Sequence, residues 1–354
     1  MTLEMTGGAA GVGVTDTRRR TADRIFRGAL VFNAALTLYW VLIAATGSGS
    51  IFFPHYAIDG GTAARLAGGI GFFYIAWGFI WYAVKNALLK YLVGFSKDER
   101  RQAFASRMDV PFDVSSFTSR YSERRIRIAD MIGRRGRFIT LAAAGFYYLY
   151  TQVVSTQSKD FAVLFLQDNL FDAVITGWVF LAFYYANGFL AAAFYGPQSR
   201  VMDGVLARAN CLLITTLWTA FKFIMVPLGA QLAVVFPAGQ FAAVFALIWG
   251  SYVVTDAMSE VGGALFGKQA IRVRGIGDVN RKSIAGTVTG FVSCLLLGLA
   301  VVSAHQLDPR WLGLVVVLSV SNTLLELYSP RGTDDFVMAT ANAAICLAFG
   351  SFVL

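Results

Sequence analysis

The segment from Ser251 to Gly290 holds the charged residues whose types and spacing have the clearest chemical pattern in the chain. Asp256 and Glu260 are four residues apart, so on a helix both carboxylates lie on one face and can share one cation. We expect that helix to end at Gly267. The loop after it carries the basic residues Lys268, Arg272, Arg274, Arg281 and Lys282. Carboxylates for a divalent metal beside bases for phosphate groups predict a site that binds a nucleotide.

A second acidic group lies near the C-terminus, where Glu326 is followed by Asp334 and Asp335. Together with the first pair it gives five carboxylates, which repel one another unless Mg²⁺ or basic side chains neutralise them. An alternative for Asp334 and Asp335 is that they only stabilise a helix N-terminus, where acidic side chains are favourable.

Further residues could contact phosphate. Lys222 falls inside an apolar segment, where it either reaches into a site or extends its amine to the membrane surface. Backbone N–H groups at a helix start near Ser283 suit a phosphate. Gly262 and Gly263, by contrast, do not form a dinucleotide fingerprint, and their spacing is more typical of closely packed membrane helices.

The elements that must position these residues are membrane helices. Of the 354 residues, 56% are hydrophobic and 14% are charged, which is too apolar for a soluble domain. Several segments reach the ~20 residues that span a bilayer, and the alternating pattern of a membrane barrel is missing from the sequence. We therefore predict an all-α polytopic integral membrane protein with about nine transmembrane helices. The predicted spans are 29–45, 66–83, 138–154, 173–195, 211–228, 234–254, 284–304, 311–327 and 337–353.

Lys and Arg gather in particular loops between these spans, as the positive-inside rule requires of cytoplasmic loops. The N-terminus is then cytoplasmic, and both acidic groups lie on the cytoplasmic side. The net charge of +9 is explained by this topology and by attraction to anionic membrane lipids, so a nucleic-acid partner is not expected.

Three regions are predicted. Residues 1–23 form a disordered basic tail, 24–137 contain two extra transmembrane helices with a basic cytoplasmic loop, and 138–354 form a membrane catalytic domain. In the loop, residues 96–137, arginines alternate with Ile126, Ile128 and Ile132, as in an amphipathic helix that lies on a membrane surface. A regulatory or substrate-docking role is the alternative.

Three segments resemble those of the CTP-dependent lipid kinases, the family of dolichol kinase, phytol and farnesol kinases and the yeast-type diacylglycerol kinase. They are TDAMSEVGGALFGK, NRKSIAGTVTGF and the run that ends in LLELYSPRGTDDF, and the resemblance covers roughly residues 205–354. The matching positions are Asp256, Glu260, Phe266, Gly267, Lys282, Ser283, Gly286, Thr287, Glu326, Asp334 and Asp335. The chain departs from the family at Ala264 and Leu265, where members often carry basic residues, and at Phe336, where Asn is usual.

The resemblance implies transfer of the γ-phosphate of CTP to a lipid alcohol with Mg²⁺ as cofactor, at an active site that faces the cytoplasm. An isoprenoid alcohol such as phytol, farnesol or a polyprenol is the first expected substrate, and diacylglycerol the second. The expected metal ligands are Asp256, Glu260, Glu326, Asp334 and Asp335. The expected phosphate-binding residues are Lys222, Lys268, Arg281, Lys282, Ser283 and Gly286. The expected catalytic residues are Asp256, Glu260, Lys282, Asp334 and Asp335.

Two other functions fit parts of the sequence. A CTP:phosphatidate cytidylyltransferase would use similar carboxylates but release pyrophosphate, and its usual Lys-Asp and Gly-Arg-Asp segments are not obvious here. A transporter or a structural membrane protein would use the charged loops only for topology, but the matching broken segments of repeat-built transporters are not found in the sequence. A homo-oligomer is compatible with the sequence.

Overall fold

A computed structural model describes residues 83–100, 225–274, 279–329 and 333–354, with residue 80 and short pieces within 24–42 and 119–132. Most of the first five predicted spans lies outside these residues, as does Lys222. The number of spans, the orientation of the N-terminus and the three predicted regions therefore stay predictions.

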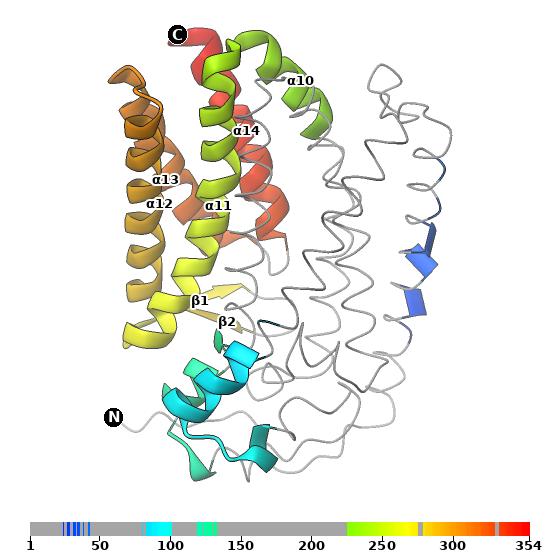
Figure 1. The fold of residues 1–354 in the computed structure, drawn as a ribbon, viewed down its shortest axis with the longest axis vertical. Helices are drawn as coiled ribbons and strands as arrows, with labels where there is room; N and C mark the ends of the chain where they lie inside the picture. The colour runs from blue at the N-terminus through cyan, green and yellow to red at the C-terminus, as the bar shows by residue number, and fades with distance from the viewer. Residues whose placement is uncertain are drawn as a thin grey trace.

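The described residues from 225 to 354 form a helical bundle with one β-hairpin (Figure 1). The helices are α10 (Met225–Val235), α11 (Ala238–Phe266), α12 (Ile284–Ala304), α13 (Arg310–Tyr328) and α14 (Asp334–Phe352), and the strands are β1 (Ala270–Arg274) and β2 (Val279–Ser283). Among the described helices, α11, α12 and α13 are long and apolar enough to cross a membrane, whereas the apolar part of α14, Phe336–Phe352, is shorter. These helices support the prediction of a helical membrane protein.

The boundaries of the later helices agree closely with the sequence. Helix α12 covers the predicted seventh span, α13 the eighth with one more residue at each end, and α14 begins at Asp334 rather than at 337. The predicted sixth span differs, because α11 begins after Pro237 and continues to Phe266. Proline cannot continue the preceding helix, so α10 ends at Val235. Helix α11 ends at Gly267, as predicted.

The segment after Gly267 corrects the prediction of a basic loop in an all-α fold, because it forms an antiparallel hairpin. Apolar and basic side chains alternate along β1, with Ile271 and Val273 as β-branched members, and this period-two pattern favours a strand. In the register of the hairpin, Ile271 lies opposite Lys282 and Val273 lies opposite Asn280.

Helix α11 is the central helix of the described bundle. In its most apolar stretch 83% of the residues are buried, against 28% for α12 and 39% for α13. Every residue from Phe241 to Trp249 is buried, as expected of a helix that is surrounded on all sides. The large apolar side chains that α12 and α13 expose, such as Val292 and Val316, suit contact with lipid.

Helices α11 and α12 pack through glycines, as the sequence predicted for Gly262 and Gly263. A Cβ at Gly262 would overlap the side chain of Thr289, and one at Gly286 would overlap the carbonyl oxygen of Ser259. At Gly290 an added Cβ would also lie 3.0 Å from the carbonyl oxygen of Thr255. The two backbones therefore approach to a distance that only glycine permits.

This close packing predicts a strong difference between two alanine substitutions. We expect Gly286→Ala to destabilise the fold by about 2 kcal/mol, since its new methyl group meets backbone that cannot rotate away. At Gly313 of α13 nothing lies within 4 Å of an added Cβ, so Gly313→Ala is expected to be neutral or stabilising by up to about 1 kcal/mol. Thermal unfolding in detergent checks both, and equal unfolding temperatures would contradict the close approach.

The basic segment of residues 119–132 packs on protein, which corrects the interpretation of its apolar side as a membrane anchor. Ile126, Ala129 and Ile132 are buried, and the last two form a small core with Leu89 and Val93 of the π-helix η1 (Leu89–Val93). The sequence shows that these positions share one face, but an apolar face packs equally well against lipid or protein.

Contacts of Glu99 stabilise this small core. The Ser96 N–H donates to the Glu99 carboxylate at 2.8 Å, and the Glu99 N–H donates to Ser96 Oγ at 3.2 Å, which is the reciprocal pattern of a capping box. Tyr121 donates to the same carboxylate at 2.6 Å. Burial and this hydrogen bond raise the pKa of Tyr121 to about 12.

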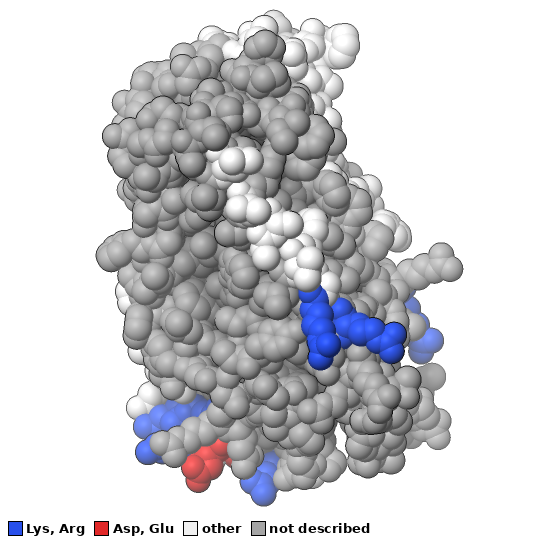
Figure 2. Space-filling view, turned by 90° about the vertical axis from the view of Figure 1, so that its right-hand side faces the viewer, with Lys and Arg blue, Asp and Glu red and all other residues white. Residues whose placement is uncertain are grey.

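The basic segment also contacts the end of α11. Arg124 donates to the Leu265 carbonyl at 3.5 Å, and Arg127 donates to the Gly267 carbonyl at 3.4 Å. Both carbonyls belong to the C-terminus of α11, where positive charge is favourable. Among the described residues on the face in Figure 2, Lys and Arg gather in the lower half, at the hairpin end of the bundle in Figure 1. This is the end that the sequence places in the cytoplasm.

Candidate metal and phosphate site

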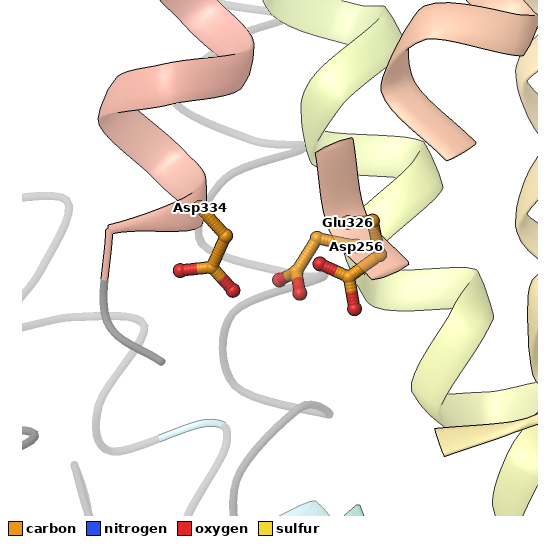
Figure 3. A group of neighbouring side chains, drawn as sticks. All are labelled: Asp256, Glu326 and Asp334. Carbon is orange, nitrogen blue, oxygen red and sulfur yellow. The ribbon is translucent and has the colours of Figure 1, made fainter. Parts of the chain in front are cut away.

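Three of the predicted carboxylates converge at the hairpin end of the bundle. Asp256, Glu326 and Asp334 each offer a carboxylate oxygen, and these oxygens lie within 4.8 Å of one another. Figure 3 shows the three side chains side by side, with Asp256 from α11 and Asp334 from the start of α14. We call these residues the carboxylate cluster.

The helix connections explain why residues so distant in sequence meet. Helix α12 leads away from the hairpin end and α13 returns to it, so Glu326 in the last turn of α13 and Asp334 at the first position of α14 lie at the same end. Asp256 joins them because α11 passes through the centre of the bundle. Asp256 is 7% exposed and Glu326 is 6% exposed, which is unusual for acidic side chains.

Lys282 of β2 reaches the carboxylate cluster and forms an ion pair with Glu326. Its side chain is 23% exposed. Burial alone would lower the pKa of Lys282, but the charges of Glu326, Asp334 and Asp256 outweigh burial, so the pKa is raised above its usual 10.5. The amine therefore stays protonated at neutral pH.

The ion pair predicts how stability depends on alkaline pH. Because the folded state raises the pKa of Lys282, its ammonium stabilises the fold fully below pH 10.5, its usual pKa, and this contribution is lost as the pH rises through the folded value. We expect the unfolding temperature to fall at higher pH by more in the wild type than in Lys282→Met. Thermal unfolding between pH 9 and 12 checks this, and parallel curves would contradict it.

Two residues that the sequence assigns to phosphate binding have structural contacts. Ser283 is the N-cap of α12, where its hydroxyl accepts from the Gly286 N–H at 3.1 Å. The Ile284 N–H donates to the Gln269 carbonyl at 3.2 Å. Two N–H groups at the start of α12 are thus already used, and the Gly286 backbone lies against α11. Phosphate binding by Ser283 and Gly286 stays a prediction.

The remaining predicted residues are placed as follows. Glu260 lies one turn beyond Asp256 on α11, is half-buried, and is not a member of the carboxylate cluster. Lys268 is exposed just after α11. Arg281 pairs with Arg272 across the hairpin, and Asp335 is the second residue of α14, but the side chains of Arg281 and Asp335 lie outside the described residues.

The sequence analysis missed two fully buried amides, Asn322 on α13 and Asn342 on α14. They face each other across the bundle, where their side chains are 2.9 Å apart between Nδ2 and Oδ1. The signal was present, since asparagine inside an apolar span is uncommon and bonds between helices.

Comparison with known proteins returned no matching family model, no matching curated protein and no matching solved structure. The resemblance to the CTP-dependent lipid kinases therefore stays a prediction that rests on the segments quoted above.

Proposed function

We propose that this protein is a membrane phosphotransferase that moves the γ-phosphate of CTP to a lipid alcohol, with Mg²⁺ bound at the carboxylate cluster. The observation that supports it best is the meeting of Asp256, Glu326 and Asp334 beside Lys282. These are members of all three sequence segments that resemble the lipid kinases, brought to one end of the bundle.

The chemistry of the cluster fits a hard divalent cation. Three carboxylates and one ammonium carry a formal net charge of −2, which one Mg²⁺ neutralises, and carboxylate oxygens are the ligands that Mg²⁺ prefers. Asp256, Glu326 and Asp334 would hold the ion. When bound, Mg²⁺ supplies charge neutralisation and orientation of the nucleotide phosphates.

The residues of the chain then have separate tasks. Lys282 donates hydrogen bonds to a phosphate oxygen, for which its position beside the cluster is suited, and Lys268 and Arg281 add positive charge nearby. A carboxylate accepts the proton of the alcohol. The alcohol oxygen forms a bond to the γ-phosphorus, the bond from that phosphorus to the β–γ bridging oxygen breaks, and CDP leaves with that electron pair.

The membrane setting favours a lipid acceptor. The cluster lies at the end of helices whose outer faces, on α12 and α13, are apolar and exposed. An alcohol headgroup could reach the cluster at this end while its tail stays in the bilayer. An isoprenoid alcohol is the first candidate and diacylglycerol the second.

A label-transfer experiment tests the proposal. Purified protein in nanodiscs is given Mg²⁺, CTP or ATP labelled at the γ-phosphate, and a panel of phytol, farnesol, a polyprenol and diacylglycerol. We expect label from CTP in an organic-soluble lipid phosphate. Incorporation of α-labelled CTP into lipid from phosphatidate would replace the kinase with a cytidylyltransferase. No transfer of either label under these conditions would overturn the proposal of an enzyme for these substrates.

A further inference from the structure

Asn322 and Asn342 join the three helices that supply the carboxylate cluster. The Asn322 Nδ2 group donates to Asn342 Oδ1 at 2.9 Å and to the Leu318 carbonyl of its own helix at 2.8 Å. In return, Asn342 Nδ2 donates to Asn322 Oδ1 at 3.2 Å and to the Ile248 carbonyl of α11 at 3.0 Å. We call this network the asparagine bridge.

The position of the asparagine bridge relates it directly to the cluster. Asn322 lies one turn before Glu326 on α13, about 6 Å along the axis. On α14, Asn342 lies two turns after Asp334, about 12 Å along the axis. On α11, Ile248 lies two turns before Asp256, which is again about 12 Å. Each of the three helices thus contributes one group to the bridge and one carboxylate to the cluster.

Fixing the register of these helices is a task that apolar packing performs poorly. In a membrane, side chains such as Leu and Val pack on neighbouring helices about as well as on lipid, so helices can slide or rotate at little cost. A fully buried amide has few alternative partners, and a single buried Asn can define the register of packed helices. Asn322 and Asn342 are both fully buried.

We propose that the asparagine bridge is a positioning device, which sets the register of α11, α13 and α14 so that Asp256, Glu326 and Asp334 converge. Asn322 and Asn342 act through the carboxylates and touch no reacting group. The positioning itself is independent of the proposed function, whereas its consequence for bound Mg²⁺ rests on it.

The variant that tests this is Asn322→Leu with Asn342→Leu, because replacing both partners by apolar residues of the same branched shape leaves no orphaned amide and can preserve stability. Ser319→Ala is the matched control. Ser319 is equally buried on α13, but within the described part of the chain its hydroxyl donates to the Val315 carbonyl of the same helix, at 2.8 Å. Thermal unfolding confirms that both variants are folded.

Two measurements are made on the folded variants. Pulsed electron paramagnetic resonance follows the distance between nitroxide labels at Tyr328→Cys on α13 and Ala344→Cys on α14, both exposed positions. The affinity for Mn²⁺, which is used in place of Mg²⁺, reports on the geometry of the carboxylate cluster. In the double Leu variant we expect a shifted or broadened distance distribution and a loss of Mn²⁺ affinity of about tenfold or more, with Ser319→Ala matching the wild type.

The outcomes separate the two proposals. A distance distribution in the double Leu variant that matches the wild type would overturn the positioning role, whatever the metal does. A changed distribution in a protein that binds no Mn²⁺ even as wild type would support the bridge and contradict the metal site. If the double Leu variant does not fold, Asn342→Asp gives the same test by the same distance measurement, because it keeps the shape of the side chain and its acceptor oxygen but removes the Nδ2 group that donates to Asn322 and Ile248.

Discussion

Replacing Asp256 by Asn is expected to reduce label transfer from CTP to lipid alcohol by at least about 100-fold, since removing even an outer-sphere partner of a metal site costs about 10–100-fold. Asn keeps the size of the side chain but removes its charge, so the cluster keeps its shape and loses a ligand. The initial rate of lipid phosphate formation at saturating CTP and Mg²⁺ measures this effect.

Two further variants show whether the loss of rate is specific to the carboxylate cluster. Glu260→Gln tests the i, i+4 pair that the sequence predicts, and because Glu260 lies outside the carboxylate cluster we expect a loss below about tenfold. Asp308→Asn removes an exposed acid from the opposite end of α13, where it pairs with Arg310 at 3.0 Å, and should leave the rate unchanged. Equal losses for Asp256→Asn and Glu260→Gln would contradict the grouping in the structure.

Removing the ammonium of Lys282 is expected to have the largest effect on stability. Lys282→Met leaves Glu326, Asp256 and Asp334 facing one another without the Lys282 ammonium, and breaking a largely buried ion pair in this way costs about 3 kcal/mol. Added Mg²⁺ should recover part of this loss, because an ion that binds only the folded state stabilises it. Thermal unfolding in detergent, with and without Mg²⁺, measures both effects.

A double-mutant cycle shows whether the pair itself is responsible. Glu326→Gln alone should cost less than Lys282→Met, since Lys282 keeps Asp334 and Asp256 as neighbouring charges. The double variant should be destabilised by less than the sum of the two, with a coupling energy of about 1–3 kcal/mol. Simple additivity would mean that Lys282 and Glu326 do not depend on each other.

Local signals in the sequence were sufficient for part of the bundle. Gly267 ends α11 because a glycine follows a long apolar run, and α12 begins at Ile284 because Ser283 can cap it. The sequence also predicted that the two acidic groups lie on one side of the membrane, and Asp256, Glu326 and Asp334 do lie at one end of the bundle. That this side is the cytoplasm stays a prediction. The two helix boundaries depend on residues that are close together in sequence.

Features that depend on long-range packing could not be predicted in the same way. The i, i+4 spacing of Asp256 and Glu260 makes them neighbours on α11, but only the packing of α13 and α14 decides that Asp256 is the one that meets Glu326. Lys282 reaches the cluster because β2 pairs with β1, and the hairpin was not predicted from its basic composition.

The most direct measurement is Mn²⁺ binding to purified protein by electron paramagnetic resonance, with and without CTP. The account predicts a bound Mn²⁺ whose affinity rises when CTP is present and falls by at least about 100-fold in Asp256→Asn. Unchanged Mn²⁺ binding in Asp256→Asn, or no binding to the wild type at millimolar Mn²⁺, would contradict the claim that the carboxylate cluster holds the metal for phosphoryl transfer.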